Sequence, residues 1–138
     1  AMFYVLVKTG FGASLRTFGC NKKRLNTDNF ADIEARLDGV VIENKDFEDL
    51  IKVYDREKAL FYCDPPYHKT ERHYTVKFTE DDHERLCRVL HQIKGRFVLS
   101  YNDDKYVRDL YKDYNIQAVT RNNSLSSGDF KEVIITNF

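Results

Sequence analysis

The strongest constraint on the fold is a short apolar run that stops at two consecutive prolines. Residues 61 to 67 read Phe-Tyr-Cys-Asp-Pro-Pro-Tyr, and these two prolines are the only ones among 138 residues. Proline fixes its own φ and has no N–H to donate, so neither a strand nor a helix continues through the pair. The apolar run predicts a strand over Ala59 to Cys63. We therefore expect Asp64 to Tyr67 to lie just beyond the carboxyl end of a strand, where open α/β sheets place their ligand sites.

The residue types of this tetrapeptide suit the binding of an exocyclic amino group. Asp64 supplies a carboxylate acceptor, Pro65 and Pro66 fix the direction of the backbone carbonyls, and Tyr67 supplies a flat ring. If Asp64 and the Pro65 carbonyl each accept one N–H of an adenine N6 amine, its lone pair turns towards an incoming methyl group. The rate of methyl transfer would be raised by positioning and electrostatics, and no covalent enzyme intermediate is needed. Tyr67 would stack on a base turned out of the duplex. The alternative is a plain turn after a strand, because Asp and Pro are common turn residues.

The tetrapeptide Asp64-Pro65-Pro66-Tyr67 resembles the catalytic motif of amino-methyltransferases that use S-adenosylmethionine. The chain as a whole resembles the Dam-like, phage-type D12 branch of the DNA N6-adenine methyltransferases. The resemblance extends in order through Phe3-Tyr4, Gly10-Phe11-Gly12, Thr17-Phe18-Gly19, residues 42–47, the catalytic motif, residues 97–103 and residues 131–137. It implies S-adenosylmethionine as the cofactor and double-stranded DNA as the substrate.

The same resemblance assigns roles to residues outside the tetrapeptide. Asp46 and Phe47 sit where the family lines the adenosine part of the cofactor, and Asp64 is expected to reach the amino group of the cofactor as well as the target amine. Asp46 is equally well placed to be the N-cap of the helix that follows it. Ser100 and Asn102 end the next predicted strand, where they would support the site or cap the following helix.

The charge of the chain is unevenly distributed. Residues 1 to 27 carry five basic side chains and no acid, whereas the remainder has 17 basic and 22 acidic residues. A basic segment of this kind suits contact with phosphates, although a solvated basic loop is common. By resemblance, residues 1–27 are a remnant of the target-recognition segment, and residues 28–138 are the C-terminal part of the catalytic domain. The predicted DNA-binding side chains are Lys8, Arg16, Lys22, Lys23 and Arg24.

Composition agrees with one compact domain. The chain is 42% hydrophobic and 14% aromatic, with no apolar span long enough for a membrane and no signal peptide. Cys20, Cys63 and Cys87 are odd in number and lack the spacing of a metal site. We therefore expect reduced thiols in a cytoplasmic compartment and no bound metal. Cys63 adjoins Asp64, and we interpret it as a small core residue rather than a nucleophile.

Periodicity and turn residues predict alternating strands and helices. Thr79 should cap a helix with Asp82 at the capping-box position, Gly95 should end that helix, and Asn102 or Asp103 should begin another. Further helices are expected over 28–37 and 46–54, and strands over 3–7, 40–43, 59–63, 96–100, 116–120 and 132–137. This order predicts an α/β fold, a partial Rossmann-like methyltransferase domain whose sheet is mainly parallel with an antiparallel hairpin at its C-terminal end.

One element of the family is absent from the sequence. Members carry a first strand and a Phe-x-Gly-x-Gly turn that holds the methionine part of the cofactor, and nothing before Phe3 matches it. Gly10-Phe11-Gly12 is a weak substitute because no clear helix follows it. Ala1 precedes the only Met of the chain, which suggests a tag remnant before a start at Met2.

We therefore expect a truncated or split methyltransferase. The missing strands would leave the strand at 59–63 with an unpaired edge, which predicts self-association or pairing with a second chain. The alternative to an active enzyme is a noncatalytic fragment that binds DNA through its basic segment, or only folds.

Overall fold

The computed structural model describes residues 30–70, 77–122 and 129–138. The chain divides into two compact units, residues 1–43 and 44–138. In the described part of the first unit, helix α2 spans Phe30–Leu37 and buries none of its side chains. Among the described residues, no helix has both the length and the apolar character that crossing a membrane requires.

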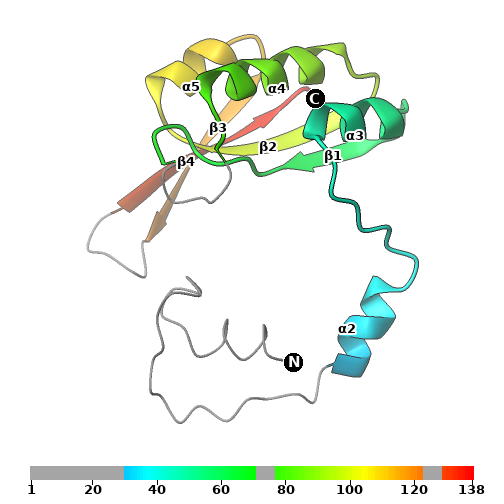
Figure 1. Ribbon diagram of the computed structural model, residues 1–138. Coiled ribbons are helices and arrows are strands. Elements are labelled where there is room, and N and C mark those ends of the chain that lie inside the picture. Colours follow the sequence, from blue (N-terminus) through cyan, green and yellow to red (C-terminus); the bar gives the residue numbers. More distant parts are fainter. Residues whose placement is uncertain (1–29, 71–76, 123–128) are drawn as a thin grey trace. The chain divides into compact units, whose positions relative to one another are not determined.

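The described part of the second unit forms a four-stranded sheet with three helices (Figure 1). Its strands lie in the order β1-β2-β4-β3, so β2 and β4 are central. The helices α4 and α5 lie along one face of this sheet (Figure 1). In chain order the elements are α3 (Phe47–Tyr54), β1 (Leu60–Cys63), α4 (Glu80–Gln92), β2 (Arg96–Asn102), α5 (Lys105–Leu110), β3 (Asn115–Asn122) and β4 (Asp129–Thr136).

The prediction of a mainly parallel sheet is wrong. Strands β1 and β2 are parallel, but β4 is antiparallel to both β2 and β3. The predicted C-terminal hairpin is present, and its second strand, rather than its first, pairs with β2. This insertion of β4 between β2 and β3 makes two of the three strand pairs antiparallel.

The core lies between the sheet and its helices. On β2 and β4 the residues that alternate towards the helices, Phe97, Leu99, Tyr101, Val133 and Ile135, are at most 1% exposed. Facing residues from the helices complete the cluster, and they include Leu86, Leu90, Val107 and Tyr111. Alternate residues of these strands thus pack against helically spaced side chains of α4.

The helix starts follow from their caps. Thr79 and Asp82 form the predicted capping box, in which each side chain accepts the backbone N–H of the other residue. Asp46 is the N-cap of α3 and accepts from Glu48 N at 2.9 Å. Helix α5 begins later than expected, because Asp104 rather than Asn102 or Asp103 is its N-cap.

The strand predicted over Val40 to Glu43 does not form. The segment has no regular structure, and Val41 and Ile42 are 72% and 82% exposed. A run of β-branched residues favours extended backbone, but a strand also needs a neighbouring strand for its hydrogen bonds. No such strand pairs with this run among the described residues.

Candidate active site

Strand β1 delivers Asp64 to the carboxyl edge of the sheet. Cys63 is in register with Leu99 of the parallel strand β2, so Asp64 and Ser100 come next to each other. The buried Ser100 hydroxyl donates a hydrogen bond to Asp64 Oδ1 at 2.7 Å. The Asp64 side chain is itself exposed and forms no ion pair with any described residue. The carboxylate is thus held at one oxygen and remains accessible to a ligand.

A cavity of about 370 Å³ opens beside this carboxylate. Asp64 and Pro65 form part of its rim, and Phe47 and Phe78 lie in its wall with ring centroids 5.9 Å apart. The remaining lining residues are Leu50, Ile51, Leu60, Phe61, Tyr62, Cys63 and Leu86. Apolar walls with a carboxylate at the edge suit a flat heterocycle that bears an amino group.

An ion-pair cluster holds the start of α3 against α4 beside this cavity. Arg85 donates to both carboxylate oxygens of Asp46, at 2.8 and 3.0 Å, and to Asp82 at 3.0 Å. Its guanidinium also lies 4.2 Å from the centre of the Phe47 ring. The hydrogen bond from Arg85 is the main cause that lowers the pKa of Asp46. The N-cap interpretation of Asp46 is confirmed, and its role toward a cofactor stays a prediction.

Tyr67 is anchored away from the cavity. Its hydroxyl donates to Glu132 Oε1 at 3.0 Å, and its ring packs 6.1 Å from that of Tyr101. Burial, together with the hydrogen bond and charge of Glu132, raises the pKa of Tyr67 to about 12, so the phenol keeps its proton at neutral pH. The half-buried Tyr67 is not among the described residues that line the cavity.

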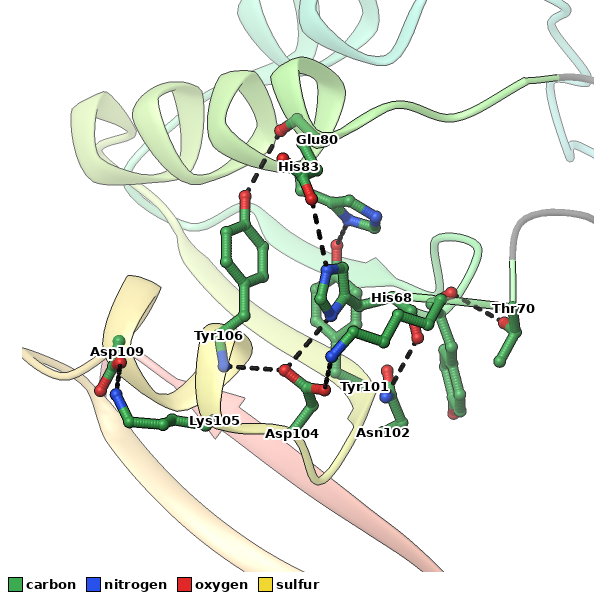
Figure 2. Close-up of polar contacts among 12 residues, drawn as sticks. His68, Thr70, Glu80, His83, Tyr101, Asn102, Asp104, Lys105, Tyr106 and Asp109 are labelled. Atoms are coloured by element: carbon green, nitrogen blue, oxygen red, sulfur yellow. Dashed lines mark hydrogen bonds and ion pairs between the residues drawn. The ribbon is translucent and has the colours of Figure 1, made fainter.

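The residue after the tetrapeptide ties the loop to α5 (Figure 2). His68 is 5% exposed, its ring stacks on Tyr106 at 4.4 Å, and Nδ1 lies 3.2 Å from Asp104 Oδ1. Asn102 donates to the His68 carbonyl at 3.2 Å. Burial opposes the charge of Asp104, but the hydrogen bonds from Tyr106 N and Lys69 lower its pKa overall. The chain therefore leaves the tetrapeptide along a fixed path.

A second histidine supports the same region from α4. His83 Nδ1 is 2.5 Å from the Tyr101 hydroxyl, and the His83 ring meets the His68 ring edge-on with centroids 5.7 Å apart (Figure 2). Phe78 precedes the Thr79 cap and packs edge-on against His83 at 4.8 Å. This is the hydrophobic staple, in which the residue before an N-cap contacts the fourth helical residue.

The structure brings together part of the predicted site. Asp64, Pro65 and Phe47 line one cavity, and Ser100 supports Asp64. Cys63 packs against the core, and burial raises the pKa of its thiol to about 11, which suits a packing role. Sequence reasoning missed Phe78, which the staple position could have indicated, and Glu132 and His68, for which no local signal exists.

Several predicted residues lie outside the described part of the chain. They are the Gly10-Phe11-Gly12 turn and the basic side chains Lys8, Arg16, Lys22, Lys23 and Arg24. Within the described residues, no cluster of His, Cys, Asp and Glu is arranged to hold a metal ion.

Comparison with protein families gives one match over most of the chain. A family model described as D12 class N6 adenine-specific DNA methyltransferase matches residues 8–125. The matched range includes β1, the tetrapeptide, the cavity and Ser100, but it ends before β4.

Proposed function

Because the chain belongs to the D12 class N6 adenine-specific DNA methyltransferases, we propose that it carries the amine-binding half of their active site. The family is one of enzymes that methylate adenine in DNA. In our proposal the methyl group comes from S-adenosylmethionine, and the acceptor is the N6 amine of an adenine turned out of a DNA duplex.

The position of Asp64 supports this proposal most strongly. The carboxylate is accessible, is held by Ser100 at one oxygen and shares a cavity rim with Pro65. Asp64 and the Pro65 carbonyl would each accept one N–H of the adenine amine and direct its lone pair outwards. After the nitrogen has gained its new bond to carbon, Asp64 would accept the surplus proton. Rate enhancement would come from positioning and from charge placed beside the amine.

The cavity is the proposed place of the cofactor. When bound, S-adenosylmethionine supplies an activated methyl group. Phe47 and Phe78 would enclose its adenosine ring, and apolar neighbours such as Ile51 would exclude water. Both oxygens of Asp46 accept hydrogen bonds from Arg85, and their remaining lone pairs would accept an adenosine N–H.

DNA would be bound by the basic segment at residues 1–27. Its side chains Lys8, Arg16, Lys22, Lys23 and Arg24 would contact phosphates, with an affinity that falls as salt rises. Tyr67 would stack on the displaced adenine. The free thiols of Cys63 and Cys87 suit a reducing cytoplasmic compartment.

We also propose that another strand pairs with β1. In the described sheet β1 is an edge strand, and its Leu60 and Tyr62 are 63% and 69% exposed. An exposed apolar edge favours pairing with a further strand. A second copy of this chain or another chain would supply that strand.

The test is transfer of a labelled methyl group from S-adenosylmethionine to an adenine-containing duplex. We expect incorporation by the native protein and a loss of at least about 100-fold in Asp64→Ala, the scale for removing one preorganised polar group. The control is Asp109→Ala on α5, where an exposed carboxylate pairs with Lys105. Equal activity of the Asp64→Ala variant would contradict the proposal. Failure of the native protein to bind the cofactor in calorimetry would favour the noncatalytic alternative.

A further inference from the structure

Tyr67 is connected to a carboxylate that is distant in the sequence and buried in the sheet. Its hydroxyl donates to Glu132 Oε1 at 3.0 Å across 65 residues. Glu132 is only 5% exposed and lies on the central strand β4, between Asn102 of β2 and Val119 of β3. The bond therefore joins the end of the tetrapeptide to the middle of the sheet.

Fold stability alone does not explain a buried carboxylate at position 132. Removing a carboxylate from water destabilises a fold unless hydrogen bonds compensate for the lost hydration. An apolar side chain at position 132 would avoid this cost and suit a central strand. The hydrogen bond to Tyr67 gives the carboxylate a specific use.

The two ends of the tetrapeptide are held from the two central strands. Ser100 of β2 holds Asp64 at 2.7 Å, and Glu132 of β4 holds Tyr67 at 3.0 Å. Because β4 is antiparallel to β2, the first half of β4 lies beside the carboxyl end of β2. Glu132 therefore lies beside the carboxyl end of β2, near the end of β1 that Asp64 follows, although the two residues are far apart in the sequence.

The Glu132 bond restricts how the Tyr67 ring can turn. The ring already contacts Tyr101 with a centroid distance of 6.1 Å and an interplanar angle of 40°. The bond at the hydroxyl fixes the opposite end of the phenol, so the ring plane is determined at two points. A stacking surface requires a defined plane, because offset-stacked rings depend on their mutual orientation.

We infer that Glu132 is a positioning residue, which holds the Tyr67 ring in the orientation that stacks on the target base. This inference rests on the proposed function. It adds a residue on β4, beyond the range of the family match, to the residues that determine adenine binding.

The test compares Glu132→Leu, which removes the acceptor, with Glu132→Gln, which keeps one. Misplaced reacting groups slow catalysis steeply, so we expect Glu132→Leu to lower kcat for methyl transfer about 10-fold to 100-fold, with KM for the cofactor unchanged. Glu132→Gln should lose less than about 3-fold, because a neutral hydrogen bond remains. If Glu132 acts through the phenol, Glu132→Leu should cause no further loss in a Tyr67→Phe background. An equal loss in both backgrounds would overturn the inference.

A second measurement does not depend on catalysis. Ring signals of ¹³C-labelled Tyr67 should shift and broaden in Glu132→Leu and stay near their native positions in Glu132→Gln. Unchanged ring signals in the folded Glu132→Leu variant would overturn the inference. If the native protein transfers no methyl group, the proposed function fails, and the ring signals still decide whether Glu132 orients Tyr67. Should Glu132→Leu not fold, Tyr67→Phe and Glu132→Gln give the same comparison.

Discussion

Strands β1 and β2 are parallel neighbours in one sheet, yet their surroundings differ sharply. Phe97 and Leu99 of β2 are completely buried, whereas Leu60 and Tyr62 of β1 are 63% and 69% exposed. The strand β2 lies between two others, and β1 lies at the edge of the described sheet. The central strand β2 makes the sheet rigid, and the edge strand β1 leaves one side of the sheet accessible to a ligand or another strand.

The candidate site lies at the boundary between these two regions. Asp64 follows the edge strand β1, but its hydrogen-bond donor Ser100 belongs to the central strand β2. The cavity is lined largely from the β1 side, by Leu60 to Pro65. The Asp64 carboxylate can therefore stay accessible while the core fixes its position.

The largest expected difference between the regions is in stability. Leu99→Ala should lower the free energy of unfolding by about 3 kcal/mol, because it opens a cavity in a packed core. Leu60→Ala should change it by less than about 0.5 kcal/mol, since most of that side chain already contacts water. Urea unfolding of both variants measures the difference. Similar losses would show that β1 is covered in solution, by a second copy or another chain.

The turn that leads into β2 should be the next most sensitive position. A Cβ at Gly95 would lie 2.8 Å from the carbonyl oxygens of Arg56 and Ala59, just before β1. Both are backbone atoms, so Gly95→Ala should cost about 2 kcal/mol in urea unfolding, as overpacking does. The control is Lys94→Ala, because alanine keeps the backbone N–H that Lys94 donates to Asp55. A Gly95→Ala variant as stable as the control would mean that the two strand starts separate easily.

The cap of α4 should contribute less. Thr79→Ala removes the side chain that accepts from Asp82 N and should lower stability by about 1 kcal/mol. Thr79→Ser keeps the hydroxyl and should lose only a fraction of that. Thermal or urea unfolding measures the stability of both variants. An equal loss of stability in the two would assign the effect to the methyl group of threonine rather than to the capping box.

The smallest effect concerns acid stability on the β1 side. The hydrogen bond from the Arg85 guanidinium lowers the pKa of Asp46 below its ordinary value of 3.8. Around that pH, Asp46 is therefore protonated to a smaller extent in the folded state than in the unfolded state. Its contribution is present above that pH and is lost as the pH falls through the lowered pKa. Asp46→Asn keeps an N-cap but removes the charge, and should flatten the fall in stability below pH 4 in urea unfolding. The same acid dependence in this variant would exclude the ion pair as the cause.

Local features of the fold were predictable from the sequence, and long-range ones were not. The Thr79 capping box, the Asp46 N-cap and the end of β1 before Pro65 and Pro66 depend on neighbouring residues, so local sequence predicts them. The position of β4 between β2 and β3 depends on strand pairing across about thirty residues, which periodicity does not encode.

In the candidate site, too, local contacts were predictable from the sequence and long-range contacts were not. Asp64 and Phe47 were found because they belong to recognisable local patterns. Glu132 was not, because its contact with Tyr67 spans 65 residues and nothing next to it suggests a ligand. The Val40 to Glu43 run shows the converse, because a good strand pattern forms no strand where no strand of the described residues pairs with it.

The most direct test of the account is to identify the methylated atom. An adenine-containing duplex is incubated with the protein and S-adenosylmethionine, digested to nucleosides and analysed by mass spectrometry. We predict N6-methyladenine from the native protein and from Asp109→Ala, and none from Asp64→Ala. Methylation at another atom, undiminished N6-methyladenine from Asp64→Ala, or no product from the cofactor-bound native protein would contradict an amine held by Asp64 and Pro65.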